Sequence, residues 1–174
     1  CFLTARALEQ IKNDVAYSDI PVKLIGISAG VSYGALGSTH HSLHDFAALR
    51  AVDNLHIVVP ADNFEAREAI RASINYPYPI YIRFGKKPLP KLHSLDSRFK
   101  IGKAITLKEG EEVTFIATGE TVWRAYEASK ILAEEGISCG VISMHTLKPL
   151  DVEMIRKVAG STQIIITVEE HSAN

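Results

Sequence analysis

The chain has 174 residues, of which 47% are hydrophobic and 22% are charged, as in an ordinary globular protein. Its 19 basic and 20 acidic residues leave a net charge of −1, which provides no basic field for nucleic acid or for an anionic membrane. No apolar run approaches the roughly 18–20 residues of a membrane-spanning helix, so we expect neither nucleic acid nor a membrane as partner.

The first half of the chain predicts alternating helices and strands. Apolar residues repeat on one helical face near the N-terminus, and Asp62 or Asn63 is a suitable cap for a later helix. The expected elements are a helix over 2–17, a buried strand over 22–27, a helix from about residue 42, a strand over 56–59, a helix over 64–74 and a strand over 80–84. This order predicts parallel strands joined by helical crossovers.

The second half predicts another α/β unit after a linker. Residues 85–100 are rich in Lys, Pro and His and lack an apolar repeat, as is typical of a linker. The expected elements beyond it are a hairpin of strands over 101–107 and 113–117, a helix over 122–133, a strand over 138–143, a short helix over 152–158 and a strand over 163–168. The fold class is therefore α/β with two domains. Residues 1–84 form a mostly parallel sheet flanked by helices, and residues 101–174 form a smaller mixed sheet.

The two ends and the cysteines give further expectations. Cys1 begins inside a helical pattern and Asn174 closely follows an apolar strand, so we interpret the chain as part of a longer protein. The N-terminus lacks the layout of a signal peptide. Cys1 and Cys139 cannot build a disulfide framework, which favours a cytoplasmic location, and Cys139 is expected to be packing inside a buried strand.

A glycine-containing loop over residues 28–41 is the first candidate site, and it ends in His40 and His41. Glycine permits close approach of the backbone to a ligand, and imidazole transfers protons near neutral pH. In open α/β sheets, ligands bind beyond the carboxyl ends of the strands, which is where this loop begins. A surface loop with two solvated histidines fits the same residues.

Other candidate residues also have simple structural explanations. His40 and His44, with Asp45 nearby, have the spacing of metal ligands on a helix, but the glutamate of the zinc-protease pattern is missing and we expect no metal site. Arg83 at a strand end suits a bound carboxylate or phosphate, or an ion pair with a local acidic residue. Residues 169–171, Glu-Glu-His, fit an interface or a solvated edge better than catalysis.

Taken together, these motifs resemble the transketolase family of thiamine-diphosphate enzymes. The resemblance is to the group with transketolase and deoxyxylulose-phosphate synthase, including bacterial transketolases split into two subunits. It covers nearly the whole chain and is carried by residues 2–11, 30–34, 37–41, 59–62, 81–83, 147–151 and 167–171. It implies the rear part of a pyrimidine-binding domain over 1–84, a linker over 85–100 and most of a transketolase C-terminal domain over 101–174.

The resemblance also implies roles for individual residues. Phe2, which otherwise suits a core position, resembles the aromatic ring that stacks on the aminopyrimidine of the cofactor. His40 resembles the histidine that contacts the donor substrate and assists its proton transfers, with His41 beside it in the substrate loop. Arg83 resembles the arginine that clamps a sugar phosphate, and we expect it to face the same cleft as His40. Ser28 stands where transketolases place a substrate-contacting histidine.

Other departures bear on the activity that the resemblance implies. Leu36 stands where the family has an aspartate that reads a sugar hydroxyl, so polyols would be discriminated differently. The glutamate that activates the aminopyrimidine is expected upstream of Cys1. Thiamine diphosphate and Mg²⁺ would then require a pyrophosphate-binding domain or subunit in a homo- or hetero-oligomer.

The implied reaction is transfer of a two-carbon ketol unit between sugar or sugar-phosphate substrates. One alternative is a synthase of the deoxyxylulose-phosphate type, which decarboxylates a 2-oxo acid. The other is a non-catalytic module of the same fold that only pairs with another subunit.

Overall fold

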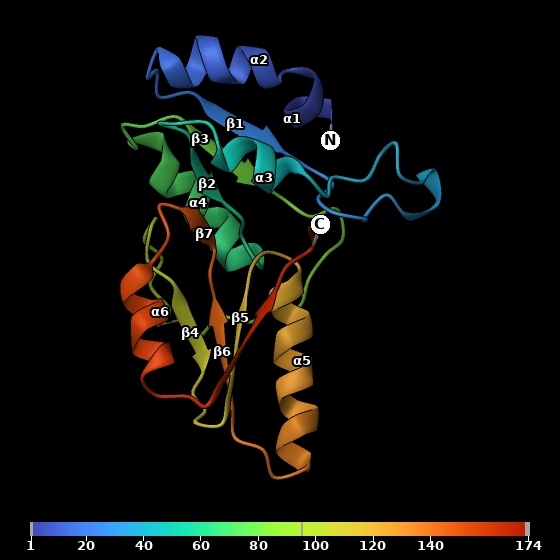
Figure 1. Cartoon of the computed structure of the whole chain (residues 1–174), viewed down its shortest axis with the longest axis vertical. Coiled ribbons are helices and arrows are strands. Elements are labelled where there is room, and N and C mark those ends of the chain that lie inside the picture. The colour runs from blue at the N-terminus through green and yellow to red at the C-terminus, as the bar shows by residue number, and fades with distance from the viewer. Residues whose placement is uncertain (1, 95, 173–174) are drawn as a thin grey trace.

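The computed structural model describes residues 2–94 and 96–172. Their strands form two four-stranded sheets, one above the other in Figure 1. The predicted α/β class is confirmed, although the second sheet has as many strands as the first and is not the smaller one.

The first sheet has the strand order β1-β3-β2-β7. Strands β1 (Lys23–Gly26), β3 (Ile80–Arg83) and β2 (His56–Val58) are parallel, as predicted. The fourth strand, β7 (Thr146–Lys148), was not predicted and pairs antiparallel with β2. Because β7 belongs to the second half of the chain, its pairing joins that half to the first sheet. The predicted boundary between two domains is thus crossed by a shared sheet.

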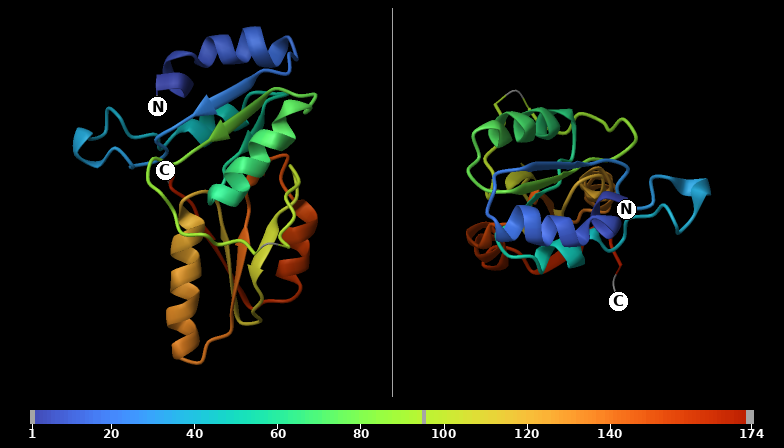
Figure 2. Two further views of the ribbon diagram at one scale, coloured as in Figure 1. Left: turned by 180° about the vertical axis from the view of Figure 1, so that it is seen from behind. Right: turned by 90° about the horizontal axis from the view of Figure 1, so that it is seen from above.

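Helices cover both faces of the first sheet, as Figure 2 shows. Those on one face are α1 (Phe2–Arg6), α2 (Leu8–Gln10), the π-helical η1 (Ile11–Tyr17) and α3 (Asp45–Arg50), and α4 (Asn63–Ile74) covers the other. Side chains alternate along each strand, so Ile57 packs beside Ile11 on the first face and Val58 beside Ala69 on the second. The single helix expected over 2–17 is interrupted at Ala7.

Two local expectations have different outcomes. Asp62 caps α4 as predicted, because its Oδ1 accepts a hydrogen bond from the backbone N–H of Glu65 at 3.0 Å.

The strand β1 was expected to be buried but is half-exposed, with Ile25 43% accessible. The reason is that β1 is an edge strand and has a neighbour on one side only.

The second sheet has the strand order β4-β6-β5-β8. Its elements are β4 (Ile105–Lys108), β5 (Val113–Ala117), α5 (Thr121–Glu134), β6 (Cys139–Ser143), α6 (Val152–Ala159) and β8 (Ile164–Val168). The predicted hairpin is wrong, since β6 lies between β4 and β5. The loop between β4 and β5 instead packs on the start of β6, where a Cβ on Gly110 would lie 2.1 Å from the carbonyl carbon of Cys139.

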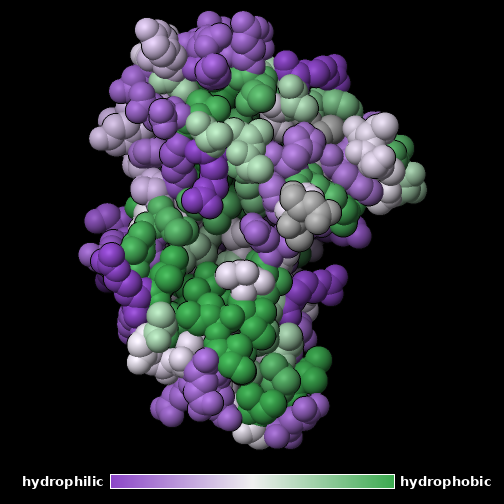
Figure 3. All heavy atoms as spheres, viewed as in Figure 1, coloured by the Kyte–Doolittle hydropathy of each residue, from purple (hydrophilic) through white to green (hydrophobic). Residues whose placement is uncertain are grey.

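The two helices of the second sheet lie on opposite faces. Phe115 and Val141 pack with Val122 of α5, whereas Thr114 and Ile142 line a small cavity with Val158 of α6. The edge strand β8 leaves isoleucines exposed at positions 164, 165 and 166. Figure 3 shows a broad apolar surface over the second sheet on the face toward the viewer. Apolar patches of this kind mark surfaces that pack against another element or chain.

Within the described residues, the helices are all too short or too polar to span a bilayer. Cys139 is 1% exposed and is not in a disulfide, which confirms its predicted burial.

Candidate functional site

A cleft of about 190 Å³ opens beyond the carboxyl end of β1. Its walls come from α1, from residues 25–29 at the end of β1, and from Tyr33, Ser42 and Tyr81. Two of the lining residues, Gly26 and Tyr81, pack closely on each other. A Cβ added to Gly26 would lie 2.7 Å from the Tyr81 hydroxyl, so a larger residue would not fit there. Its position agrees with the expectation that a ligand binds beyond this strand.

Three of the predicted site residues meet at this cleft. Phe2 and Ser28 line it, and the Phe2 ring is 45% exposed rather than part of the core. The imidazole of His40 contacts the edge of Phe2, with ring centroids 5.2 Å apart, and also contacts Tyr33 at 5.3 Å. His40 Nδ1 forms a hydrogen bond with the Thr39 hydroxyl at 3.0 Å, which leaves Nε2 as the nitrogen for a ligand.

The backbone at Ser28 is in the left-handed region, with φ at 64°, and the residue is 3% exposed. A non-glycine residue in this conformation stores strain that the surrounding structure must hold in place, and such residues cluster at ligand sites. The turn at Ser28 directs the chain away from β1 and into the glycine-containing loop.

That loop forms an arm, residues 30–42, which projects from the body beside α1 (Figures 1 and 2). Gly30 and Ser42 pair as an antiparallel bridge at its base, and the 3₁₀ turn η2 (Gly34–Leu36) lies at its tip. His41 is turned back onto the arm, where its Nε2 lies 3.4 Å from the Gly34 carbonyl oxygen. His40 therefore lies beside the cleft, while His41 contacts its own loop.

We expected Arg83 to share a cleft with His40, but Arg83 does not line the cleft beyond β1. It is 3% exposed, and its Nε lies 2.8 Å from the buried carboxylate of Asp45. Its Nη2 donates hydrogen bonds to the carbonyl oxygens of Ser42 at 3.0 Å and Glu170 at 3.2 Å. The guanidinium also covers the ring of Phe46 at 4.4 Å. This is the local ion pair that the sequence offered as the simpler explanation.

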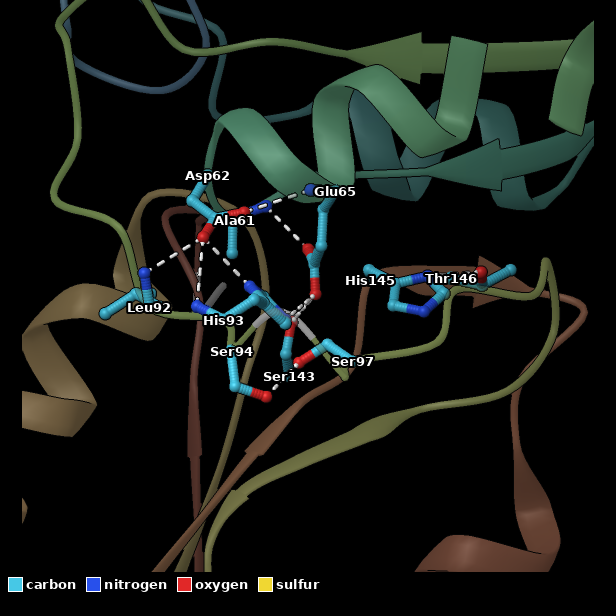
Figure 4. A network of polar contacts seen from close by, with 10 residues as sticks. All are labelled: Ala61, Asp62, Glu65, Leu92, His93, Ser94, Ser97, Ser143, His145 and Thr146. Carbon is cyan, nitrogen blue, oxygen red and sulfur yellow. Dashed lines mark hydrogen bonds and ion pairs between the residues drawn. The ribbon is translucent and has the colours of Figure 1, made fainter. Parts of the chain in front are cut away.

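A second polar cluster, which the sequence did not suggest, lies where the two halves of the chain meet (Figure 4). His93, from the segment predicted as a linker, has both ring nitrogens against carboxylates. Nδ1 lies 2.9 Å from Asp62 and Nε2 lies 3.0 Å from Glu65. Glu65 also accepts hydrogen bonds from the Ser143 hydroxyl at 2.6 Å and from the Ala61 amide at 2.7 Å.

The charges of this cluster are fixed by its contacts. Burial opposes the charge on His93, but the contacts with Asp62 and Glu65 outweigh it and raise the pKa of His93 to about 9. Burial likewise opposes the charge on Asp62, yet hydrogen bonds from His93 and from backbone amides lower the pKa of Asp62 to about 2. Burial lowers the pKa of the nearby His145, which favours its neutral form. Ion pairs thus join the linker to the start of α4, and the hydrogen bond from Ser143 joins β6 to the same cluster.

Comparison with known proteins gives the family of the chain. The model of the transketolase pyrimidine-binding domain matches residues 1–91, and that of the transketolase C-terminal domain matches residues 102–174. The chain is 50% identical to an apulose-4-phosphate transketolase subunit of Phocaeicola vulgatus, over 99% of this chain and 55% of that protein. It is 38% identical to the putative transketolase C-terminal section of Methanocaldococcus jannaschii, over 98% of this chain and 54% of that protein. The chain thus spans about half the length of these relatives.

The fold agrees with the sequence matches. A split-gene transketolase, solved as an inactive beta4 tetramer, superposes with a TM-score of 0.88 at 36% identity, over 98% of this chain and 55% of that one. Transketolase from Campylobacter jejuni superposes with a TM-score of 0.78 at 20% identity, over 97% of this chain and 30% of that one, which supports the fold alone. The resemblance identified in the sequence is confirmed, and the chain belongs to the transketolase family.

Proposed function

We propose that the protein containing this chain is a subunit of a thiamine-diphosphate-dependent transketolase that transfers a two-carbon ketol unit between sugar or sugar-phosphate substrates. This chain supplies the pyrimidine side of the active site. The observation that carries the proposal is the contact of Phe2 with His40 beside the cleft beyond β1, with ring centroids 5.2 Å apart. It occurs in a chain that belongs to the transketolase family.

The residues present fit one side of the cofactor. Phe2 offers an exposed aromatic ring at the rim of the cleft, suited to packing against an aminopyrimidine. Thiamine diphosphate, when bound, supplies the carbanion chemistry, and the protein orients it and moves protons. The described residues contain no group of three or more His, Cys, Asp or Glu side chains arranged for a metal ion. Following the resemblance to the family, we assign Mg²⁺ and the pyrophosphate to a partner domain or subunit.

The side chains around the cleft divide the remaining tasks. His40 is proposed to contact the donor substrate and transfer its protons through Nε2, since Nδ1 is held by Thr39. Ser28 and His41 are proposed as weaker polar contacts to the substrate, at the floor of the cleft and on the arm. The phosphate-clamping role of Arg83 stays a prediction, because the guanidinium would have to exchange its contact with Asp45 for one with the substrate.

The proposed assembly is an oligomer in the cytoplasm in which a pyrophosphate-binding subunit closes the cleft. Two of the relatives described above are a transketolase subunit and a transketolase C-terminal section, and both support a split arrangement. The exposed isoleucines of β8 support the presence of further packing partners. The free, buried thiol of Cys139 is compatible with a reducing compartment.

The test is ketol transfer by the full-length subunit reconstituted with its pyrophosphate-binding partner and thiamine diphosphate. His40→Ala is expected to lower the rate by about 100-fold or more, as for other groups that transfer protons. His44→Ala removes an exposed histidine outside the cleft and is the matched control. A His40→Ala rate within about threefold of the control would contradict the proton-transfer role.

The same preparation separates the alternatives. Product formation from a 2-oxo acid and an aldehyde, without ketol transfer, would indicate a decarboxylating synthase. Absence of cofactor binding in the intact complex would indicate a non-catalytic subunit. For Arg83, a rise in KM of Arg83→Lys that is confined to phosphorylated donors would support the phosphate clamp, because lysine lacks the planar fork of arginine.

A further inference from the structure

A short segment from the second half of the chain lies against the base of the arm. We define the C-terminal segment as residues 169–172, which follow β8 and reach the arm base in Figure 1. Glu170 Oε1 accepts a hydrogen bond from the backbone N–H of Val31 at 3.0 Å. Its other oxygen packs directly on Gly30, where an added Cβ would lie 1.8 Å from Oε2. Glu170 thus occupies the space that the glycine leaves open.

The opposite side of the arm base is held by the same segment. Ser172 donates its backbone N–H to the carbonyl oxygen of Leu43 at 2.8 Å. His171 accepts a hydrogen bond from the Ala47 amide at 3.3 Å, and its ring stacks on Phe46 with centroids 5.3 Å apart. Consecutive residues of the C-terminal segment therefore bind both sides of the arm base.

The arm has little of its own to fix its direction. Apart from the Ser42 to Gly30 pair at the base, its described backbone hydrogen bonds are short-range, such as Gly34 to Val31 and His40 to Gly37. Loops whose own hydrogen bonds are mostly local belong to the less stable parts of a protein. Beyond its base, the arm also meets the body through ring contacts, His40 with Phe2 at 5.2 Å between centroids and Tyr33 with Lys86 Nζ at 3.9 Å. The hydrogen bonds that join the arm to the body lie at its base, so the place of His40 depends on them.

We propose that Glu170 is a positioning residue, which fixes the arm through the Val31 amide and the Gly30 backbone and thereby places His40 beside Phe2. The inference rests on the proposed function, in which His40 contacts the donor substrate. Small displacements of a catalytic group are enough to lower a rate strongly. Glu170 does not line the cleft, so it acts on the reaction only through the arm.

The first test is hydrogen exchange at the Val31 amide in the full-length subunit bound to its partner. Glu170→Ala is expected to speed this exchange on the order of tenfold, since a hydrogen bond to a charged acceptor is lost. Glu170→Gln keeps an acceptor oxygen and is expected to restore most of the protection. Glu169→Ala removes the exposed neighbouring carboxylate and is expected to match the wild type. Unchanged exchange in a folded Glu170→Ala protein would overturn the proposal.

The second test is a double-mutant cycle with His40. Glu170→Ala is expected to lower kcat/KM about tenfold, comparable to the loss of one charge-assisted hydrogen bond, and to leave cofactor affinity unchanged. In the His40→Ala background the same substitution is expected to have little effect, because the group that it places is gone. Fully additive losses would overturn the proposal. If the wild-type complex has no ketol-transfer activity, the proposed function fails, and the exchange experiment still decides whether Glu170 anchors the arm.

Discussion

The ring of Phe2 meets the imidazole of His40 edge to face, with centroids 5.2 Å apart and planes at 82°. One ring comes from the first helix and the other from the arm that follows β1, so the contact brings the arm against the Phe2 side of the cleft. The aromatic surface expected to hold a cofactor ring thus lies next to the group expected to move protons.

Phe2→Ala is expected to weaken thiamine diphosphate binding to the reconstituted complex by up to about tenfold, because the stacking surface is lost. Titration of the cofactor-free complex measures this change. Tyr17→Ala, which removes an aromatic ring that is 87% exposed and lies outside the cleft, is the control. Equal cofactor affinity in the two variants would show that Phe2 does not contact the cofactor.

Gly30→Ala is expected to destabilise the chain more than Gly34→Ala. Both glycines have positive φ, 53° and 52°, so alanine costs about 1–2 kcal/mol of backbone strain at either position. Only at Gly30 does the new Cβ collide with Glu170, since nothing lies within 4 Å of Gly34. Displacing that carboxylate adds about 1 kcal/mol for the lost hydrogen bond to Val31. Urea denaturation measures the difference, and equal losses would argue against a close Glu170 contact.

His93→Gln is expected to lower the free energy of unfolding by about 3–5 kcal/mol, because it leaves two buried carboxylates without a cation. The side chains of His93, Asp62 and Glu65 are completely buried. Urea denaturation of the variant measures the loss, with the exposed His44→Gln as control. A loss no larger than that of the control would mean that the cluster contributes nothing to stability.

The contribution of His93 is expected to depend on pH. Folding raises its pKa from 6.5 to about 9, so the stabilisation is fully present below pH 6.5 and is lost as the pH rises through 9. The contribution of Asp62 to stability depends on pH in the opposite direction. Folding lowers the pKa of Asp62 from 3.8 to about 2, so its contribution is lost as the pH falls through that range.

The matching measurement is the difference in unfolding free energy between the wild type and His93→Gln from pH 6 to 9.5. That difference is expected to shrink steadily as the pH rises. Burial, the largest cause of the lowered pKa of His145, is common to both proteins and largely cancels, whereas the smaller lowering by the charge of His93 is lost in the variant. A difference that stays constant with pH would show that folding does not raise the pKa of His93.

Part of the candidate site was predictable because its residues follow one another along the chain. Ser28 follows the end of β1 at Gly26 by two residues, and the glycines of the arm precede His40 within the same short loop. The contact partners of Arg83 were not predictable in the same way. Asp45 was one of many acidic residues, and only the packing of α3 against β3 brings its carboxylate to 2.8 Å from the guanidinium. From the sequence, Glu170 fitted an interface or a solvated edge, because its contact with the arm also depends on tertiary packing.

The local elements and the family could be inferred from the order of the residues alone. Apolar periodicity and the Asp62 cap depend on neighbours within a few residues, so nearly every helix and strand could be located. The tertiary structure decided the rest, including β7 joining the first sheet, β6 separating β4 from β5, and His93 lying between Asp62 and Glu65. The physical reason is that several strand pairings and ion pairs satisfy the same local pattern, and only packing of the whole chain selects among them.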